Sequence, residues 1–124
     1  MDVYSMLQTA VVLLLLTAAG GVVMAIRRLG AKQNPPDWLA MAHGLLAAAA
    51  FTLVIYAAFQ EGIPASAVTG VVVLLVAAAG GIVMNLHYHL AGQLIPQWLL
   101  HLHILLAVVG TTLIAWGAGG APAT

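Results

Sequence analysis

Four long runs of apolar residues cover most of this chain and leave little room for charge. They extend over residues 3–26, 38–59, 65–86 and 98–116. Each holds about 19–24 residues, the length that an α-helix needs to cross a hydrocarbon core of roughly 30 Å. None alternates between apolar and polar residues as the strands of a membrane barrel do. The pattern therefore predicts four transmembrane helices.

The composition excludes several classes of protein. Of the 124 residues, 64% are hydrophobic and 5% are charged, whereas a soluble domain carries about 25% charged residues. Disordered chains combine low hydrophobicity with high net charge, and this chain has neither. It contains no cysteine, which rules out disulfides, thiolate metal sites and iron–sulfur clusters. No basic cluster offers a site for nucleic acid, so membrane lipid is the expected surroundings.

Short connections separate the four runs. Residues 29–37, 60–64 and 89–97 contain the prolines, glycines and Asn that end one helix and begin the next. Short connections make neighbouring helices antiparallel, so we expect an all-α, integral-membrane, four-helix up-down bundle over residues 1–117. A flexible tail is expected over 118–124. The first run is interpreted as a retained helix, because it is too long for a signal peptide and follows an acidic segment.

The basic residues indicate an orientation. All three, Arg27, Arg28 and Lys32, lie in or beside the first connection. By the positive-inside rule, connections 29–37 and 89–97 are expected on the cytoplasmic side of a bacterial-type inner membrane, with both termini outside. Tryptophans stand at the span ends, where interfacial aromatic residues belong: Trp38, Trp98 and Trp116.

The two halves of the chain match at an offset of 60 without a gap. Residues 9–57 and 69–117 are identical at 22 of 49 positions. The match predicts two helical hairpins, about 9–60 and 69–120, related as parallel repeats by an axis along the membrane normal. The matched pairs include chemically distinctive residues: Gly20 and Gly80, Gly21 and Gly81, Met24 and Met84, Pro36 and Pro96, Trp38 and Trp98, His43 and His103.

Only two of the five histidines are shared by both halves, His43 and His103. They fall in the second and fourth spans, which lie diagonally in a four-helix ring. Adjacent helices pack about 8–10 Å apart, so the diagonal is roughly 13 Å, and two inward imidazoles leave room for one metal ion. Zinc would need four ligands, whereas a porphyrin supplies four nitrogens to iron and leaves two axial positions. The pair predicts one haem b with His43 and His103 as its metal ligands.

Glycine pairs lie at the same predicted depth as the two histidines. They are Gly20-Gly21 in the first span and Gly80-Gly81 in the third. Because glycine has no side chain, a flat macrocycle could lie against bare backbone there. Close packing of helices through small residues is the alternative explanation.

Cationic residues stand beyond the glycine pairs. Arg27 or Arg28, and His87 in the second half, are predicted to pair with the carboxylates of a haem. Met24 and Met84 lie on the same helical stripes, but soft core packing is their expected role.

The remaining titratable residues predict no catalytic arrangement. His89 and His101 have no repeat partner and are expected at the wetted interface; a second metal or haem site, a proton route to a quinone, or contacts with a partner subunit stay open. The carboxylates Asp2, Asp37 and Glu61 sit at span ends. An ion-driven transporter, which needs carboxylates within the membrane, is therefore disfavoured.

A small four-helix membrane protein with paired histidines on its second and fourth helices, here His43 and His103, resembles the membrane b-type cytochromes, including the cytochrome b561-like group. The resemblance implies that electrons pass between quinol and a partner redox protein or subunit. It also implies an electron carrier or anchor subunit rather than a complete enzyme. The first span carries no histidine, which departs from the family's two-haem pattern.

Two other interpretations use the same residues differently. The chain could be a structural or accessory subunit of a larger membrane complex, or a homo-oligomer, that binds pigment, quinone or lipid; a pigment would use each histidine singly. Alternatively, a transition-metal carrier would use a cluster of four histidines: His87, His89, His101 and His103.

Overall fold

The computed structural model describes residues 1–120, and that part of the chain is helical with short connections and no strand. Its elements, in chain order, are α1 (Val3–Gly30), α2 (Asp37–Gln60), α3 (Ala65–Val83), the π-helix η1 (Met84–His89) that continues α3, and α4 (Gln97–Gly119). The prediction of four apolar helices, each long and apolar enough to cross a membrane, is confirmed.

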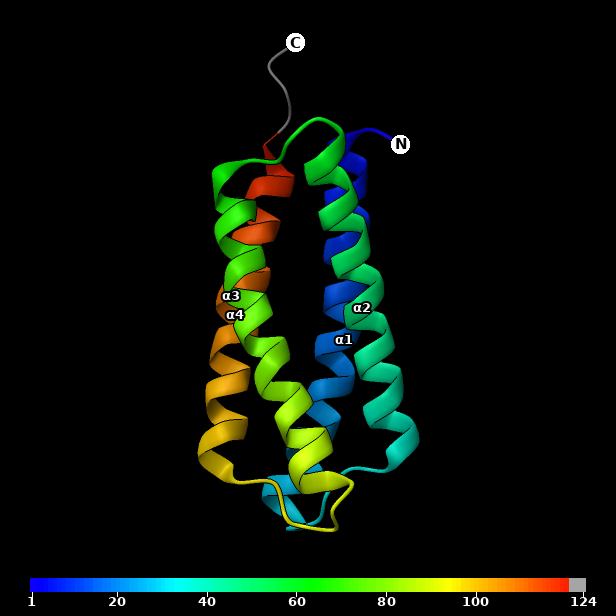
Figure 1. Cartoon of the computed structure of the whole chain (residues 1–124), viewed down its shortest axis with the longest axis vertical. Coiled ribbons are helices and arrows are strands. Elements are labelled where there is room, and N and C mark those ends of the chain that lie inside the picture. The colour runs from blue at the N-terminus through cyan, green and yellow to red at the C-terminus, as the bar shows by residue number, and fades with distance from the viewer. Residues whose placement is uncertain (121–124) are drawn as a thin grey trace.

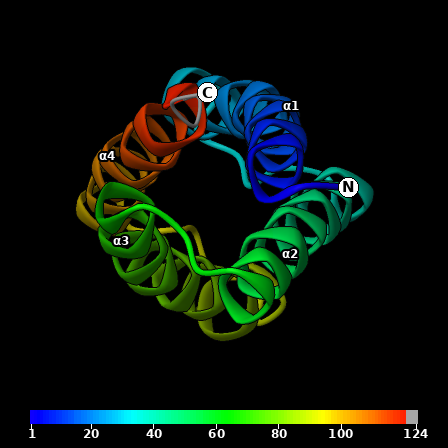
Figure 2. The same ribbon diagram turned by 90° about the horizontal axis from the view of Figure 1, so that it is seen from above.

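The long helices stand side by side along one axis (Figure 1). Connections 31–36 and 90–96 lie together at one end of the molecule, which we call the loop end. The N-terminus and the 61–64 turn lie at the opposite end, the termini end. Viewed along the axis, α2 stands across from α4, and α1 across from α3 (Figure 2).

The outward faces of the helices carry large apolar side chains that the described residues, 1–120, leave uncovered. Leu15, Val22, Val72 and Leu105 are each 57–59% exposed. Water penalises exposed apolar area by about 25 cal/mol per Å², whereas lipid chains are as apolar as leucine and impose no such penalty. The surface is therefore suited to a membrane.

Small residues allow the helices to approach each other inside the bundle. Ala10 on α1 and Ala50 on α2 are completely buried. Their equivalents 60 residues later are Gly70 on α3 and Gly110 on α4, and a Cβ atom at Gly70 would lie 2.8 Å from the Gly110 carbonyl oxygen. Backbones approach closely at small residues, so α3 and α4 are closer here than alanine would permit.

The two sides of the bundle between the hairpins differ. α1 packs against α4, but α2 and α3 hardly pack against each other. They are joined by a tight turn in which Gly62 adopts a φ of 79°, a conformation that glycine adopts without strain. An exact twofold relation would make these two sides alike, so the hairpins are not arranged with strict symmetry.

Side chains join the two connections at the loop end. The Asn34 amide group donates to the Gln93 carbonyl oxygen at 2.7 Å, and its oxygen accepts from the Ile95 backbone N–H at 3.1 Å. Arg28 donates through Nε to the Ile95 carbonyl oxygen at 2.7 Å. These bonds fasten the first hairpin to the second.

The third span ends differently from the first. Residues 24–29 continue α1 as an α-helix, but the equivalent residues 84–89 form η1. The Leu90 N–H donates to the Asn85 carbonyl oxygen at 2.9 Å, a bond from i to i−5. His89, expected in a connection, is instead the last residue of this π-helix.

Two helix ends also differ from the expected spans. α1 continues past Ile26 to Gly30, because basic residues are favourable in the last turn of a helix and can reach the interface. α4 continues to Gly119, so it includes the start of the expected tail; residues 121–124 lie outside the described residues. At the other terminus, Asp2 caps α1 by accepting the Ser5 backbone N–H at 2.8 Å, which lowers the pKa of its carboxyl group.

The close α3–α4 contact predicts that Gly110→Ala destabilises the protein by about 1–3 kcal/mol, the usual effect of overpacking. A Cβ atom there would lie 2.6 Å from Leu74 Cγ. Gly44 is the matched control, since a Cβ atom at that helical glycine meets nothing within 4 Å. Unfolding of the purified protein in detergent, followed by circular dichroism, should show Gly44→Ala unchanged or more stable. Equal destabilisation by both substitutions would contradict the packing argument.

Candidate functional site

The structure brings His43 of α2 and His103 of α4 together inside the bundle. Their ring centroids are 6.2 Å apart, and the ring planes are inclined by 58°. Each histidine lies six residues after the first residue of its helix, which corresponds to about 9 Å along the axis from the loop end. Both rings are partly buried. The two residues shared by both halves of the sequence are therefore neighbours in space.

Each imidazole is held by the backbone of the preceding helix. Nδ1 of His43 lies 2.8 Å from the Thr17 carbonyl oxygen, and Nδ1 of His103 lies 2.7 Å from the Ala77 carbonyl oxygen. A carbonyl oxygen can only accept, so Nδ1 must carry the proton in both rings. Nε2 then bears the lone pair that binds a metal.

The second glycine of each pair makes room for the adjacent imidazole. A Cβ atom at Gly21 would lie 3.1 Å from Cε1 of His43, and one at Gly81 would lie 3.2 Å from Cε1 of His103. In a helix, the Thr17 carbonyl oxygen already accepts the N–H of residue 21. Because Gly21 has no Cβ atom, the imidazole can approach the Thr17 carbonyl oxygen from the side. The Nδ1–H group then donates to the second lone pair of that oxygen.

The first glycine of each pair has a different neighbour. A Cβ atom at Gly20 would meet Leu39 Cδ1 at 3.9 Å, and one at Gly80 would meet Leu99 Cδ1 at the same distance. These are ordinary van der Waals contacts, so neither position requires a glycine. Contact between the glycines and a macrocycle stays a prediction.

The predicted partners of the haem carboxylates have unequal surroundings. Arg27 is exposed and donates to the Asn34 carbonyl oxygen and to Gln33 Oε1, both at 3.1 Å. Arg28 is buried, with 6% of its surface exposed. His87 is exposed and stacks edge-on against Tyr88, with centroids 4.8 Å apart.

The remaining histidines do not form the cluster that a transition-metal carrier needs. Nε2 of His89 pairs with Asp37 Oδ1 at 2.8 Å, which joins the end of η1 to the start of α2, and His101 is exposed. Within residues 1–120, no three His, Asp or Glu side chains are grouped to hold an ion. The four histidines of the carrier hypothesis, which include His87, therefore form no metal-binding group among the described residues.

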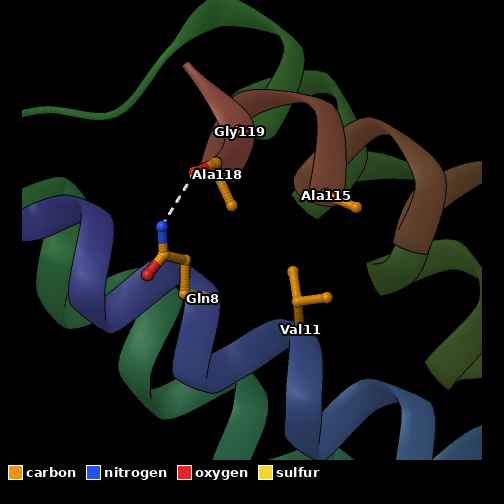
Figure 3. A pocket seen from close by; sticks show the side chains of 5 residues that line it. All are labelled: Gln8, Val11, Ala115, Ala118 and Gly119. Carbon is orange, nitrogen blue, oxygen red and sulfur yellow. Dashed lines mark hydrogen bonds between the residues drawn. The ribbon is translucent and has the colours of Figure 1, made fainter. Parts of the chain in front are cut away.

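A shallow cleft lies between α1 and α4 near the termini end (Figure 3). It has a volume of about 300 Å³ and is lined by Gln8, Val11, Ala115, Ala118 and Gly119. Gln8 Nε2 donates to the Ala118 carbonyl oxygen at 3.5 Å. Gln8 is nine residues before Thr17 on α1, about 13 Å along the helix, so this cleft is separate from the histidine pair.

Several contributors to the site were not found by sequence reasoning. The carbonyl groups of Thr17 and Ala77 belong to the backbone, so the residue types at these positions do not reveal their role. The two contacts nevertheless share a spacing of 26 residues between carbonyl group and histidine. Asn34 looked like a helix stop, yet it links the connections at the loop end. Tyr88 lies partly buried at the position equivalent to Arg28.

The separation of the two rings would allow both imidazoles to hold one ion. Two nitrogens at about 2.0–2.1 Å from one metal hold their ring centroids roughly 6 Å apart, and the observed separation is 6.2 Å. Because both Nδ1 atoms are engaged with backbone, both Nε2 atoms stay available as ligands. Two imidazoles are too few for a structural zinc site but complete the coordination of a haem iron.

Comparison of the chain with protein-family models, curated proteins and solved structures gives no match.

The role of the second glycine predicts that Gly21→Ala disturbs the hydrogen bond of His43, because a neighbour at 3.1 Å must move. Gly20→Ala is the matched control one residue away. Nuclear magnetic resonance of the ¹⁵N-histidine-labelled protein reports the state of each Nδ1 without any ligand. We expect the His43 signals to shift in Gly21→Ala and to stay in place in Gly20→Ala. Unchanged His43 signals in both variants would remove the proposed role of Gly21.

Proposed function

We propose that this protein binds one haem b between His43 and His103 and transfers electrons within a membrane. The observation that carries the proposal is the pair of imidazoles with ring centroids 6.2 Å apart, each with Nδ1 engaged by a helix carbonyl oxygen. When bound, the haem would supply a one-electron redox change at its iron. With both histidines as ligands, the iron would have no open position for substrate, which favours electron transfer over catalysis.

The chain's own residues would set the properties of the bound group. The carbonyl oxygens of Thr17 and Ala77 fix the imidazole tautomer and increase the basicity of each ligand. The apolar helices keep water away and lower the local dielectric constant, another determinant of reduction potential. The two hairpins contribute one ligand each, so binding would also hold the hairpins together.

The arrangement of the helices supports a duplicated up-down bundle. Connections lie at alternating ends (Figure 1), and the histidine-to-carbonyl spacing of 26 residues occurs once in each half. We infer that the two hairpins are parallel repeats about an axis along the membrane normal. The cluster of Arg27, Arg28 and Lys32 at the loop end favours a cytoplasmic position for that end, in a bacterial-type inner membrane.

The resemblance to b-type cytochromes suggests quinol and a partner redox protein as donor and acceptor. An accessory subunit that binds pigment, quinone or lipid is the alternative. The haem proposal and a pigment-binding subunit differ in how they would use the two histidines. A pigment needs each ring directed at its own macrocycle, whereas converging rings suit a shared ion. The centroid separation of 6.2 Å is close to that of two imidazoles that share one ion, which favours haem.

The haem assignment is tested by the reduced-minus-oxidised absorption spectrum of the protein purified in mild detergent. We expect a Soret band and a sharp α-band on dithionite reduction, typical of six-coordinate haem b. His43→Ala and His103→Ala should each abolish haem retention, because each removes one axial ligand. His89→Ala, which alters a histidine at the loop end, is the matched control and should keep its haem.

Three results would contradict the assignment. Equal haem content in all three variants would show that the two histidines are not the ligands. A protein that stays colourless after haem is added back would remove the electron-transfer proposal. Red-shifted bands of a magnesium porphyrin would identify a pigment-binding subunit instead.

The orientation is tested by thiol labelling, which is simple because the chain contains no cysteine. Lys32→Cys places a thiol at the loop end and Glu61→Cys places one at the termini end. In intact cells, a membrane-impermeant maleimide should label the variant at position 61 and not the one at position 32. The reverse pattern would invert the proposed orientation.

A further inference from the structure

The pair of His43 and His103, which we call the histidine site, lies inside the bundle, so a ligand must enter through an end or between neighbouring helices. At the loop end, hydrogen bonds hold the two connections together. Toward the termini end, about 26 Å of α2 lies beyond its histidine. The space there is filled by the main apolar core, to which all four helices contribute. Neither end of the bundle therefore offers a passage.

The four sides of the bundle differ in how firmly they are closed. Within each hairpin the two helices pack against each other, and between the hairpins α1 packs against α4. The exception is the side between α2 and α3, where the helices hardly pack. η1 packs against α3, which it continues, and hardly against α2. A ligand that arrives from the lipid therefore meets the least protein packing between α2 and α3.

The half of α2 nearest the loop end is weakly anchored. No residue of α2 before Ala50 is buried. In the equivalent half of α4, Leu99 and Leu100 are buried in an apolar cluster shared with α1 and η1. Their counterparts 60 residues earlier are only partly buried and lie outside this cluster. Displacement of segment 37–49, which carries His43, would therefore break few packing contacts.

One side-chain contact joins this weakly anchored segment to the end of η1. Nε2 of His89 lies 2.8 Å from Oδ1 of Asp37, the first residue of α2. The His89 side chain is 9% exposed, whereas that of Asp37 is 81% exposed. The equivalent positions between α1 and α4 hold Leu29 and Gln97, which cannot form an ion pair. Because an ion pair with a partner in water is weak, this contact can open and close reversibly.

We propose that the tetrapyrrole reaches the histidine site between α2 and α3, and that the contact of His89 with Asp37 closes this entrance at the loop end. This inference rests on the haem-binding function proposed above. A tetrapyrrole ring is largely apolar and would arrive from the lipid, toward which the sides of the bundle face. Opening moves segment 37–49 away from η1, and closing returns His43 to its place beside His103.

The experiment uses paired cysteines in the full-length protein, which contains none of its own. One double variant carries Asp37→Cys and His89→Cys, and a short bifunctional maleimide bridges the two thiols across the entrance. The matched control carries Leu29→Cys and Gln97→Cys, the equivalent positions between α1 and α4. Haem uptake by each apoprotein in mild detergent is followed at the Soret band, with and without the bridge.

We expect the bridge between positions 37 and 89 to slow haem uptake at least roughly tenfold, as for a lid that is held closed. The control bridge should change the rate by less than about twofold, because α1 and α4 do not have to separate. Haem leaves by the route through which it enters. A bridge between positions 37 and 89 that is formed after loading should therefore slow the release of haem to a scavenging protein by a similar factor.

A single substitution gives a second test that needs no bridge. His89→Gln removes the ion pair, so uptake and release should both become faster while the final haem content stays that of the wild type. His101→Gln is the matched control, since this exposed histidine lies on α4, and both of its rates should stay unchanged.

Equal slowing by the two bridges, or greater slowing by the control bridge, would overturn the inference and leave the haem site standing. Unchanged rates in His89→Gln would overturn the role of its contact with Asp37. If the wild type takes up no haem, the proposed haem function itself fails. If a cysteine pair does not fold or does not react, the rates of His89→Gln decide alone.

Discussion

The hydrogen bond from each histidine Nδ1 to a helix carbonyl oxygen determines how the rest of the site is built. Inside a membrane no water can satisfy an imidazole N–H, so a partner must come from the protein. Here the partners are the carbonyl oxygens of Thr17 and Ala77, which already belong to helical hydrogen bonds. Glycine at positions 21 and 81 gives each ring room, since a Cβ atom there would lie 3.1 or 3.2 Å from the imidazole. The imidazole tautomer and the ring position therefore follow from one contact made twice.

The two hairpins share this contact but differ around it. The second hairpin is closed by glycines 70 and 110 and ends its first helix as a π-helix, whereas the first uses alanines and a continuous α-helix. Short π-helices are frequently found at functional sites. Arg28 and the His89–Asp37 pair have no counterpart in the other half. The two imidazoles thus make the same backbone contact within surroundings that differ between the two hairpins.

Much of the fold follows from local pattern. Helix length and apolar composition set the four spans, and Pro36, Pro64 and Pro96 stand immediately before α2, α3 and α4. Helix ends were less predictable: α1 continues through Arg27 and Arg28, because charge at a membrane interface does not break a helix. The π-helix had no sequence signal, since its hydrogen-bond register depends on how residues 84–89 meet the neighbouring elements.

The sequence by itself determined that this chain is a set of four apolar helices with two histidines in equivalent positions, because length, composition and repetition are properties of the chain. Only the tertiary structure decided that the two rings lie 6.2 Å apart, that carbonyl oxygens accept from their Nδ1 atoms, and that Arg28 rather than Arg27 is buried. These features depend on helix rotation and on the distance between helices. Side-chain packing sets both quantities, and hydropathy leaves them open because all faces of these helices are apolar.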